Sequence, residues 1–200
     1  PEAIKMSPLI KTFKNDTNFE VRVAVTAQHR EMLDQVVNFF DIELDYDLNV
    51  MKPNQKLHHL TSILIDKITE EILEKESFDY VFVQGDTTTV LAGSLAAFYK
   101  KIKIIHIEAG LRSNDLYSPF PEEMNRVLTS KITDIHFCPT ELSKENLEKE
   151  GITNNVFVVG NTVIDALYLG LDKVKSLDQG LFFEKFSNID FNKKIILITC

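Results

Sequence analysis

Residues 79–110, DYVFVQGDTTTVLAGSLAAFYKKIKIIHIEAG, contain the clearest indication of the fold class. The stretch contains two short runs rich in β-branched and aromatic residues, 79–84 and 102–107, which are typical of buried strands. Between them, residues 88–99 are apolar almost all round, as expected of a helix that packs between other elements. A strand, a helix and a second strand in this order predict a βαβ unit with parallel strands.

The same alternation continues on both sides of this unit. Two segments with one apolar face predict helices, at 32–40 and 60–72, and Thr140 is a favourable N-cap for a helix that ends just before Gly151. Four further runs have strand character: 21–26, 132–137, 156–159 and 194–199. The predicted fold class is therefore α/β, a Rossmann-like parallel sheet with helices on both faces.

The two ends of the chain and its last quarter predict the domain organisation. The chain begins with Pro1 rather than Met and ends directly after an apolar run, so we expect both ends to be cut. From residue 175 to residue 194, the sequence has mixed polar and aromatic residues without a clear period. We expect a Rossmann-like domain over 1–175, a linker over 176–193, and the first strand of a truncated second domain over 194–200.

Composition and charge exclude several classes of protein. The chain of 200 residues has 22 Lys and Arg against 30 Asp and Glu, a net charge of −8, which argues against binding to a nucleic-acid backbone. No apolar run approaches the roughly 20 residues of a membrane-spanning helix, so we expect a cytoplasmic protein without a membrane partner. Cys138 and Cys200 lack the spacing of a zinc site or a disulfide framework.

Two acidic residues lie just after predicted strands. Asp86 follows the strand 79–84 and Glu108 follows the strand 102–107. The carboxyl ends of parallel strands line the ligand crevice of an open sheet, and Gly85 and Gly110 permit a sharp turn or a close approach to a ligand there. Asp86 serves equally well as the N-cap of the next helix, and that alternative stays open. Glu108 has no capping role, which favours a functional one.

A third acidic cluster lies in the segment YSPFPEEMNR, residues 117–126. Pro121 suits the first helical position, and the helix dipole favours Glu122 and Glu123 in the first turn. This structural interpretation accounts for both glutamates, although the rigid entry would also aim a carboxylate at a ligand. Arg126 has the spacing for an i,i+4 ion pair with Glu122.

The positively charged residues and the histidines indicate which ligands the site could bind. Lys5 and Arg112 are candidates for holding a phosphate, one as a point charge and the other as a bidentate fork. The turn at Asn161 offers free N–H groups to a phosphate, although it lacks a nucleotide-binding glycine motif. His106 lies inside a strand and is interpreted as structural. The histidines have no metal-binding spacing, so neither a metal nor a cofactor is predicted.

Six motifs in one order carry a resemblance to a known family. The chain resembles the non-hydrolysing UDP-N-acetylglucosamine 2-epimerases of bacteria. The motifs are PEAIKM (1–6), TAQHREML (26–33), QGDTTT (84–89), HIEAGLR (106–112), SPFPEEMNR (118–126) and GNTVID (160–165). The resemblance implies the N-terminal half of a two-domain glycosyltransferase-B fold, with its first strand missing. It also implies a homodimer that interconverts UDP-GlcNAc and UDP-ManNAc, a step of cell-envelope polysaccharide synthesis.

The resemblance also implies roles for individual residues. Asp86, Glu108 and Glu122 match catalytic carboxylates of the family, and Lys5 matches a substrate-binding lysine. The implied route is loss of UDP from C1 and removal of the C2 proton to give 2-acetamidoglucal, followed by re-addition of UDP. A second UDP-GlcNAc, acting as an activator, is expected near Gln28 and Gln55.

Two alternatives to this function stay open. One is a C2 epimerase of a different UDP-2-acetamido sugar, and the other is a UDP-sugar-binding module without turnover. For the 2-epimerase that the resemblance implies, we expect the chain alone to be inactive, because it would carry only about half of the active site.

Overall fold

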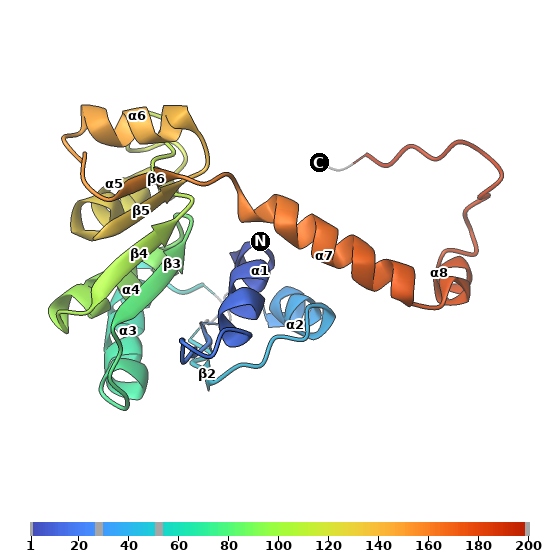
Figure 1. The fold of residues 1–200 in the computed structure, drawn as a ribbon, viewed down its shortest axis with the longest axis horizontal. Coiled ribbons are helices and arrows are strands. Elements are labelled where there is room, and N and C mark those ends of the chain that lie inside the picture. Colours follow the sequence, from blue (N-terminus) through green and yellow to red (C-terminus); the bar gives the residue numbers. More distant parts are fainter. Residues whose placement is uncertain (1, 27–29, 51–53, 199–200) are drawn as a thin grey trace. The chain divides into compact units, whose positions relative to one another are not determined.

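The computed structural model describes residues 2–26, 30–50 and 54–198. The chain forms two compact units, residues 1–166 and residues 167–200. The first unit contains every strand among the described residues and all the helices up to the first turn of α7 (Thr162–Ser176) (Figure 1). The second contains the rest of α7 and the short helix α8 (Gln179–Lys185).

A parallel four-stranded sheet is the centre of the first unit. The sheet has the order β3-β4-β5-β6 and consists of β3 (Tyr80–Gln84), β4 (Lys103–Ile107), β5 (Ile135–Cys138) and β6 (Val156–Val158). All neighbours pair in parallel. The helices between successive strands are α4 (Thr88–Tyr99), α5 (Glu122–Ile132) and α6 (Glu141–Lys149). The predicted βαβ unit over 79–110 is therefore confirmed.

The remaining elements of the first unit come from the N-terminal part of the chain. The helices are α1 (Glu2–Lys14), α2 (Arg30–Phe39) and α3 (Leu57–Ile68), which continues into a π-helical turn (Thr69–Leu73). A separate parallel pair joins β1 (Ala24–Val25) and β2 (Tyr46–Asp47). The predicted helix over 60–72 is thus α3 together with the π-helical turn.

Alternation along the strands explains why helices cover both faces of the sheet. Val83 and Ile104 point to one face and pack against α4, whereas Phe82 points to the opposite face. There its ring meets Phe13 of α1, with 5.4 Å between the ring centroids. Helices on both faces were predicted and are confirmed.

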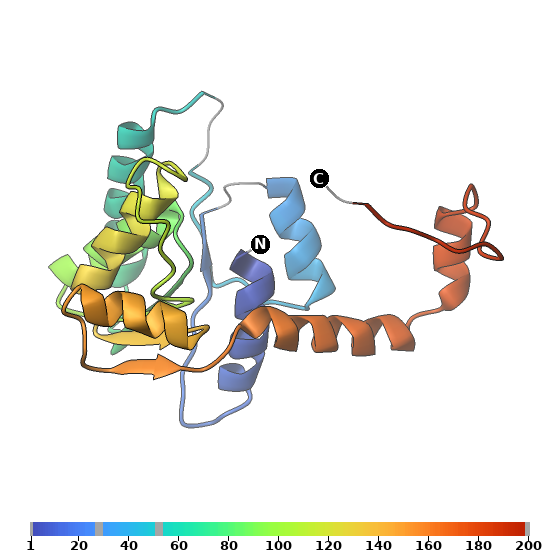
Figure 2. The ribbon, with the colours of Figure 1, turned by 90° about the horizontal axis from the view of Figure 1, so that it is seen from above.

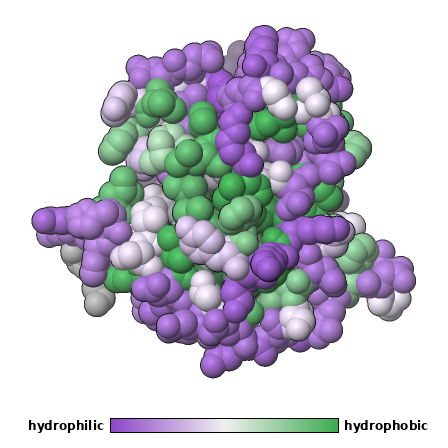
Figure 3. All heavy atoms as spheres, turned by 90° about the vertical axis from the view of Figure 1, so that its left-hand side faces the viewer, coloured by the Kyte–Doolittle hydropathy of each residue, from purple (hydrophilic) through white to green (hydrophobic). Residues whose placement is uncertain are grey.

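Small residues let α3 and α4 pack closely, side by side (Figure 2). Ala92 and Ala96 of α4 are fully buried and contact the apolar stripe of α3 that includes Leu64. The surface is not polar throughout. Figure 3 shows apolar atoms gathered among polar ones on one side of the molecule. Phe98 and Tyr99 at the end of α4 and Leu128 of α5 are exposed.

Three predicted strands differ from the structure. The one predicted at 21–26 is reduced to β1, which lies outside the four-stranded sheet. The strand predicted at 132–137 begins only at Ile135, because Ile132 still belongs to α5. Residues 194–198 form no strand, since a strand needs a neighbour to pair with and these residues have none among those that the structure describes; Ile196–Ile198 are more than 80% exposed. The expected linker also contains α8. The domain limits at residues 175 and 193 stay predictions.

Candidate active site

The candidate site lies at the carboxyl ends of β3 and β4, where each strand turns sharply. Gly85 and Gly110 have φ angles of +80° and +83°, which glycine adopts without steric cost. His106 is 1% exposed, and its Nε2 hydrogen bonds to the carbonyl of Gly85 at 2.7 Å. Burial lowers the pKa of His106 to about 4, so the ring is neutral and holds the turn before Asp86 in place. The structural interpretation of His106 is confirmed.

Glu108 is held by three donors from three parts of the chain. Lys5 Nζ of α1 and Gln84 Nε2 of β3 each lie 2.6 Å from Oε2, and Asn161 Nδ2 lies 2.7 Å from Oε1. The backbone of Glu108 has a φ angle of +66°, a left-handed conformation that costs a non-glycine residue about 1 kcal/mol. The three contacts fix the carboxylate despite this cost, and the side chain is only 12% exposed.

Asp86 is not a helix cap. The N-cap of α4 is Thr87, whereas Asp86 Oδ2 accepts a hydrogen bond from Arg126 Nη2 at 2.6 Å. Burial raises the pKa of Asp86, and the charges of Glu122 and Glu108 raise it further against the opposing effect of Arg126. The structure therefore brings the three predicted carboxylates within electrostatic range of one another.

The two glutamates at the start of α5 have different environments. Glu122 is partly exposed, and its carboxylate makes no ion pair with another described residue. Glu123 is buried: its Oε1 accepts hydrogen bonds from the backbone N–H groups of Ser113 and Asn114, at 3.0 and 3.2 Å. Its Oε2 lies 3.3 Å from Arg126 Nη1. The predicted Glu122–Arg126 pair is therefore wrong, because Arg126 lies between Asp86 and Glu123.

Arg112 does not join the carboxylate cluster. Its Nε and Nη2 form a bidentate pair with Glu150, at 2.6 and 3.0 Å, and Nη2 also donates to Ser130 Oγ. The Arg112 side chain is 3% exposed, and the pair lowers the pKa of Glu150. The guanidinium fork pairs with Glu150 and ties the loop after β4 to the end of α6, and binding of a phosphate by Arg112 stays a prediction.

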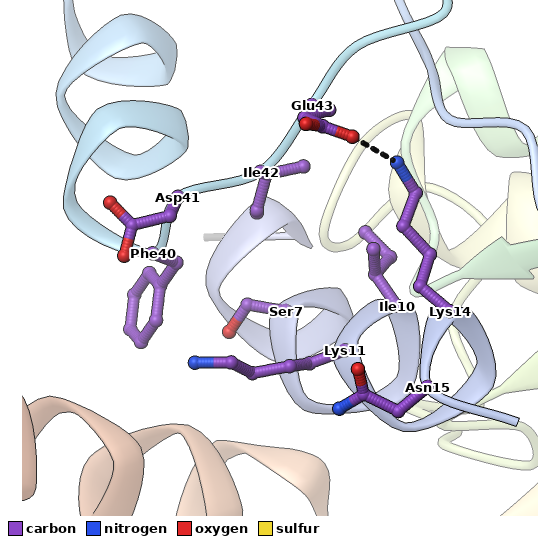
Figure 4. Close-up of a pocket in the computed structure, with 9 residues that line it drawn as sticks. All are labelled: Ser7, Ile10, Lys11, Lys14, Asn15, Phe40, Asp41, Ile42 and Glu43. Atoms are coloured by element: carbon purple, nitrogen blue, oxygen red, sulfur yellow. Dashed lines mark hydrogen bonds and ion pairs between the residues drawn. The ribbon is translucent and has the colours of Figure 1, made fainter.

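The predicted activator site can be located only in part. Gln28 lies outside the described residues, and Gln55 is partly buried just before α3. A shallow pocket of about 170 Å³ lies elsewhere, between α1 and the segment after α2 (Figure 4). Lys14 and Glu43 form an ion pair of 3.3 Å at its edge, and none of the predicted site residues line it. No group of three acidic, His or Cys side chains within 2–26, 30–50 and 54–198 has the geometry to hold a metal ion.

Comparison with known proteins places this site in a family. The profile of the family described as UDP-N-acetylglucosamine 2-epimerase matches residues 11–200. The UDP-N-acetylglucosamine 2-epimerases of Neisseria meningitidis and of Escherichia coli K12 are 53% and 52% identical to the chain over its full length. The chain belongs to the UDP-N-acetylglucosamine 2-epimerase family. It spans about half the length of these relatives, 54% in both cases.

Solved structures of 2-epimerases show the same fold. The N. meningitidis enzyme bound to UDP-GlcNAc superposes with a TM-score of 0.91 at 52% identity, covering 97% of this chain and 53% of that one. The Methanocaldococcus jannaschii enzyme in complex with UDP-GlcNAc and UDP gives 0.84 at 40% identity, covering 92% and 51%. The parallel α/β fold is thus that of the 2-epimerase family.

Two residues that the sequence analysis missed complete the environment of Glu108 in this 2-epimerase family member. Gln84 ends a predicted strand and opens the QGDTTT motif, but the sequence analysis assigns it no role, although a polar residue that closes an apolar strand is a signal for a site. Asn161 was considered for its backbone N–H groups, whereas its side chain makes the contact with Glu108. Lys5 was predicted as a phosphate ligand, and the structure places it on Glu108.

Proposed function

We propose that the protein interconverts UDP-GlcNAc and UDP-ManNAc by inverting C2 of the sugar. The observation that carries this proposal is the meeting of Asp86, Glu108 and Glu122 at one end of the sheet, beside Lys5. Membership of the family and the UDP-GlcNAc bound to the N. meningitidis relative support the choice of substrate.

The reaction needs charges of both signs around the sugar. The C2 proton is not acidic, so UDP leaves first: the C1–O bond breaks, and UDP takes the electron pair through a cation-like transition state. A carboxylate then removes the C2 proton, and the C–H electron pair forms the C1=C2 bond of 2-acetamidoglucal. Protonation of C2 on the opposite face and return of UDP to C1 give the epimer. Carboxylates stabilise the developing cation and transfer the proton, and the positive charge of a lysine stabilises the departing diphosphate.

The environments of Asp86 and Glu108 match the need for an acid and a base. Burial raises the pKa of Asp86 against the opposing effect of Arg126, whereas Glu108 accepts hydrogen bonds from three donors. Carboxyl groups in contrasting environments are the usual way in which one site provides both roles at neutral pH.

Amide substitutions test this function in a protein that spans the full length of the relatives. Asp86→Asn, Glu108→Gln and Glu122→Gln should each lower the exchange of the C2 proton with solvent deuterium at least about 100-fold, because each removes a proton-transfer group. Mass spectrometry of the UDP-sugar measures the exchange. Glu141→Gln is the matched control: Glu141 is an exposed first-turn glutamate on α6 and should exchange normally. Wild-type exchange in the Glu108 variant would exclude Glu108 from the reaction.

Three finer features of the function are also proposals. We propose a homodimer, which the exposed apolar side chains of α4 and α5 support, and a cytoplasmic location where the product feeds cell-envelope polysaccharide synthesis. None of the helices in the described part of the chain has the length and apolar character to cross a bilayer. We also propose that a second UDP-GlcNAc binds near Gln28 and Gln55 as an activator. Turnover of a panel of UDP-2-acetamido sugars would decide the substrate.

A further inference from the structure

Two neutral amide side chains hold the Glu108 carboxylate, one on each oxygen. Gln84 donates to Oε2 from β3, and Asn161 donates to Oε1 from the turn after β6. Two donors on different oxygens fix both the position of a carboxylate and the rotation of its plane. A single ion pair, such as the one with Lys5, fixes only the distance to one oxygen.

The amide of Asn161 can present only one of its ends to Glu108. Its Oδ1 accepts a hydrogen bond from the backbone N–H of Val163 at 3.0 Å, in the first turn of α7. The amide nitrogen must therefore face Glu108, where it donates at 2.7 Å. One side chain thus caps α7 and orients the carboxylate at the same time.

Gln84 is buried at a cost that only its contact with Glu108 offsets. Its side chain lies at the end of an apolar strand and is 5% exposed. Within the described residues, Gln84 Oε1 is buried and has no hydrogen-bond partner, which is unfavourable. The amide nitrogen makes its one hydrogen bond in the described structure with Glu108. An apolar residue would serve the strand better, so the contact points to a role at the site.

We propose that Gln84 and Asn161 are positioning residues that hold Glu108 in its reactive orientation during C2 epimerisation. The inference rests on the proposed function. A diphosphate near Lys5 competes with Glu108 for the ammonium group, because both are anions. The amides carry no charge and are not drawn away by the diphosphate, so they keep Glu108 in place when Lys5 turns to the substrate.

Two substitutions remove the donors with little other change. Gln84→Met keeps the length of the side chain, and Asn161→Ser keeps a cap for α7 but is too short to reach Glu108. In protein of the relatives' full length, each should lower kcat about 10- to 100-fold, the effect of a misplaced reacting group, with KM within about threefold of wild type.

Comparing three variants separates positioning from stability. Asn161→Ala should lose as much kcat as Asn161→Ser, but only the Ala variant should also lower Tm, because it alone removes the cap. Asn155→Ser is the control: Asn155 also donates its amide to a neighbour, the carbonyl of Asp134, but at the amino ends of the strands. Its kcat should stay within about twofold of wild type.

The outcomes distinguish the two proposals. Wild-type kcat in Gln84→Met and Asn161→Ser, or kcat values that follow Tm across the variants, would overturn the positioning role alone. Wild-type protein that produces no epimer from UDP-GlcNAc would overturn the proposed function and this inference with it. A loss of kcat without a loss of Tm, in an active enzyme, supports both.

Discussion

Glu122 and Glu123 are adjacent at the start of α5, yet one lies at the candidate site and the other has a structural role. Successive residues on a helix point about 100° apart, so Glu122 and Glu123 face different surroundings. Glu122 is partly exposed beside Asp86, whereas Glu123 is buried and accepts from two backbone N–H groups of the loop at 113–114. Glu123 also lies against Arg126, so its loss leaves several buried groups without a partner.

Substitution of each glutamate by glutamine should therefore affect the free energy of unfolding differently. Glu123→Gln should lower the free energy of unfolding by about 2 kcal/mol, because it removes a buried charge that faces Arg126 and two N–H donors. Glu122→Gln should change it by less than about 0.5 kcal/mol, as expected of a surface position. Urea titrations of both variants measure the difference. Equal losses would show that Glu122 is also structural.

The residues that directly follow strands were predictable, and their partners were not. Asp86 and Glu108 lie at the carboxyl ends of strands because a parallel sheet places them there, whatever the rest of the chain does. Gln84 and Asn161 reach Glu108 across 24 and 53 residues of sequence, and Arg112 reaches Glu150 across 38. Such pairings depend on how the strands and helices pack, which local sequence does not encode.

At the scale of elements, Gly110 decides how the loop after β4 packs on α6. The sequence offered two reasons for this glycine, a sharp turn or a close approach to a ligand. The structure shows the turn, with a φ angle of +83°, and an approach to the backbone of α6: a Cβ on Gly110 would lie 2.7 Å from the carbonyl carbon of Ser143. Asn146 of α6 also donates to the Gly110 carbonyl at 3.0 Å.

Substitution of two glycines should distinguish the cost of a strained backbone from the cost of steric overlap with α6. Gly151→Ala should cost about 1 kcal/mol of unfolding free energy, because Gly151 has a φ angle of +80° but open space around it. Gly110→Ala should cost more than about 3 kcal/mol, since it adds overlap with the backbone of α6 to the same strain. Thermal or urea unfolding measures both. Similar losses would mean that the loop moves away from α6 easily.

Elements were predicted best where a long apolar segment or a capping residue marked them. The helix predicted at 88–99 forms over Thr88–Tyr99, because its apolar surface is buried on nearly all sides. Thr140 caps α6 as predicted, and its hydroxyl accepts from the N–H of Ser143. By contrast, the apolar run at 194–198 has the composition of a strand without a neighbouring strand, and it forms none. Composition predicts the tendency to form a strand, whereas pairing decides whether it forms.

At the scale of the whole molecule, two buried histidines make stability depend on pH. Burial lowers the pKa of His106 and of His136 to about 4, well below the value of an exposed histidine. Both side chains are 1% exposed. The unfolded chain binds protons at these positions below about pH 6.5, and the folded chain does so only near pH 4. Their contribution is complete above pH 6.5 and is lost as the pH falls towards 4.

Stability should therefore fall with pH well before the carboxylates titrate. Between pH 7 and pH 5, we expect a loss of roughly 2 kcal/mol of unfolding free energy for each buried histidine. Urea titrations at the two pH values measure it. In His136→Gln the pH-dependent part of the loss should be about half of that in wild type. An unfolding free energy that does not change from pH 7 to pH 5 would contradict the neutral, buried state of both rings.

The identical neighbours Glu122 and Glu123 also matter for anyone who transfers residue roles between relatives by alignment. A shift of one position over this pair exchanges the partly exposed carboxylate beside Asp86 for the one that is bonded to the loop. Where a relative has only one glutamate at this point, that letter matches either position equally well, so the error leaves no trace in the identity score. The hydrogen bonds from the preceding loop, at residues 113–114, rather than the alignment, tell which glutamate faces the site.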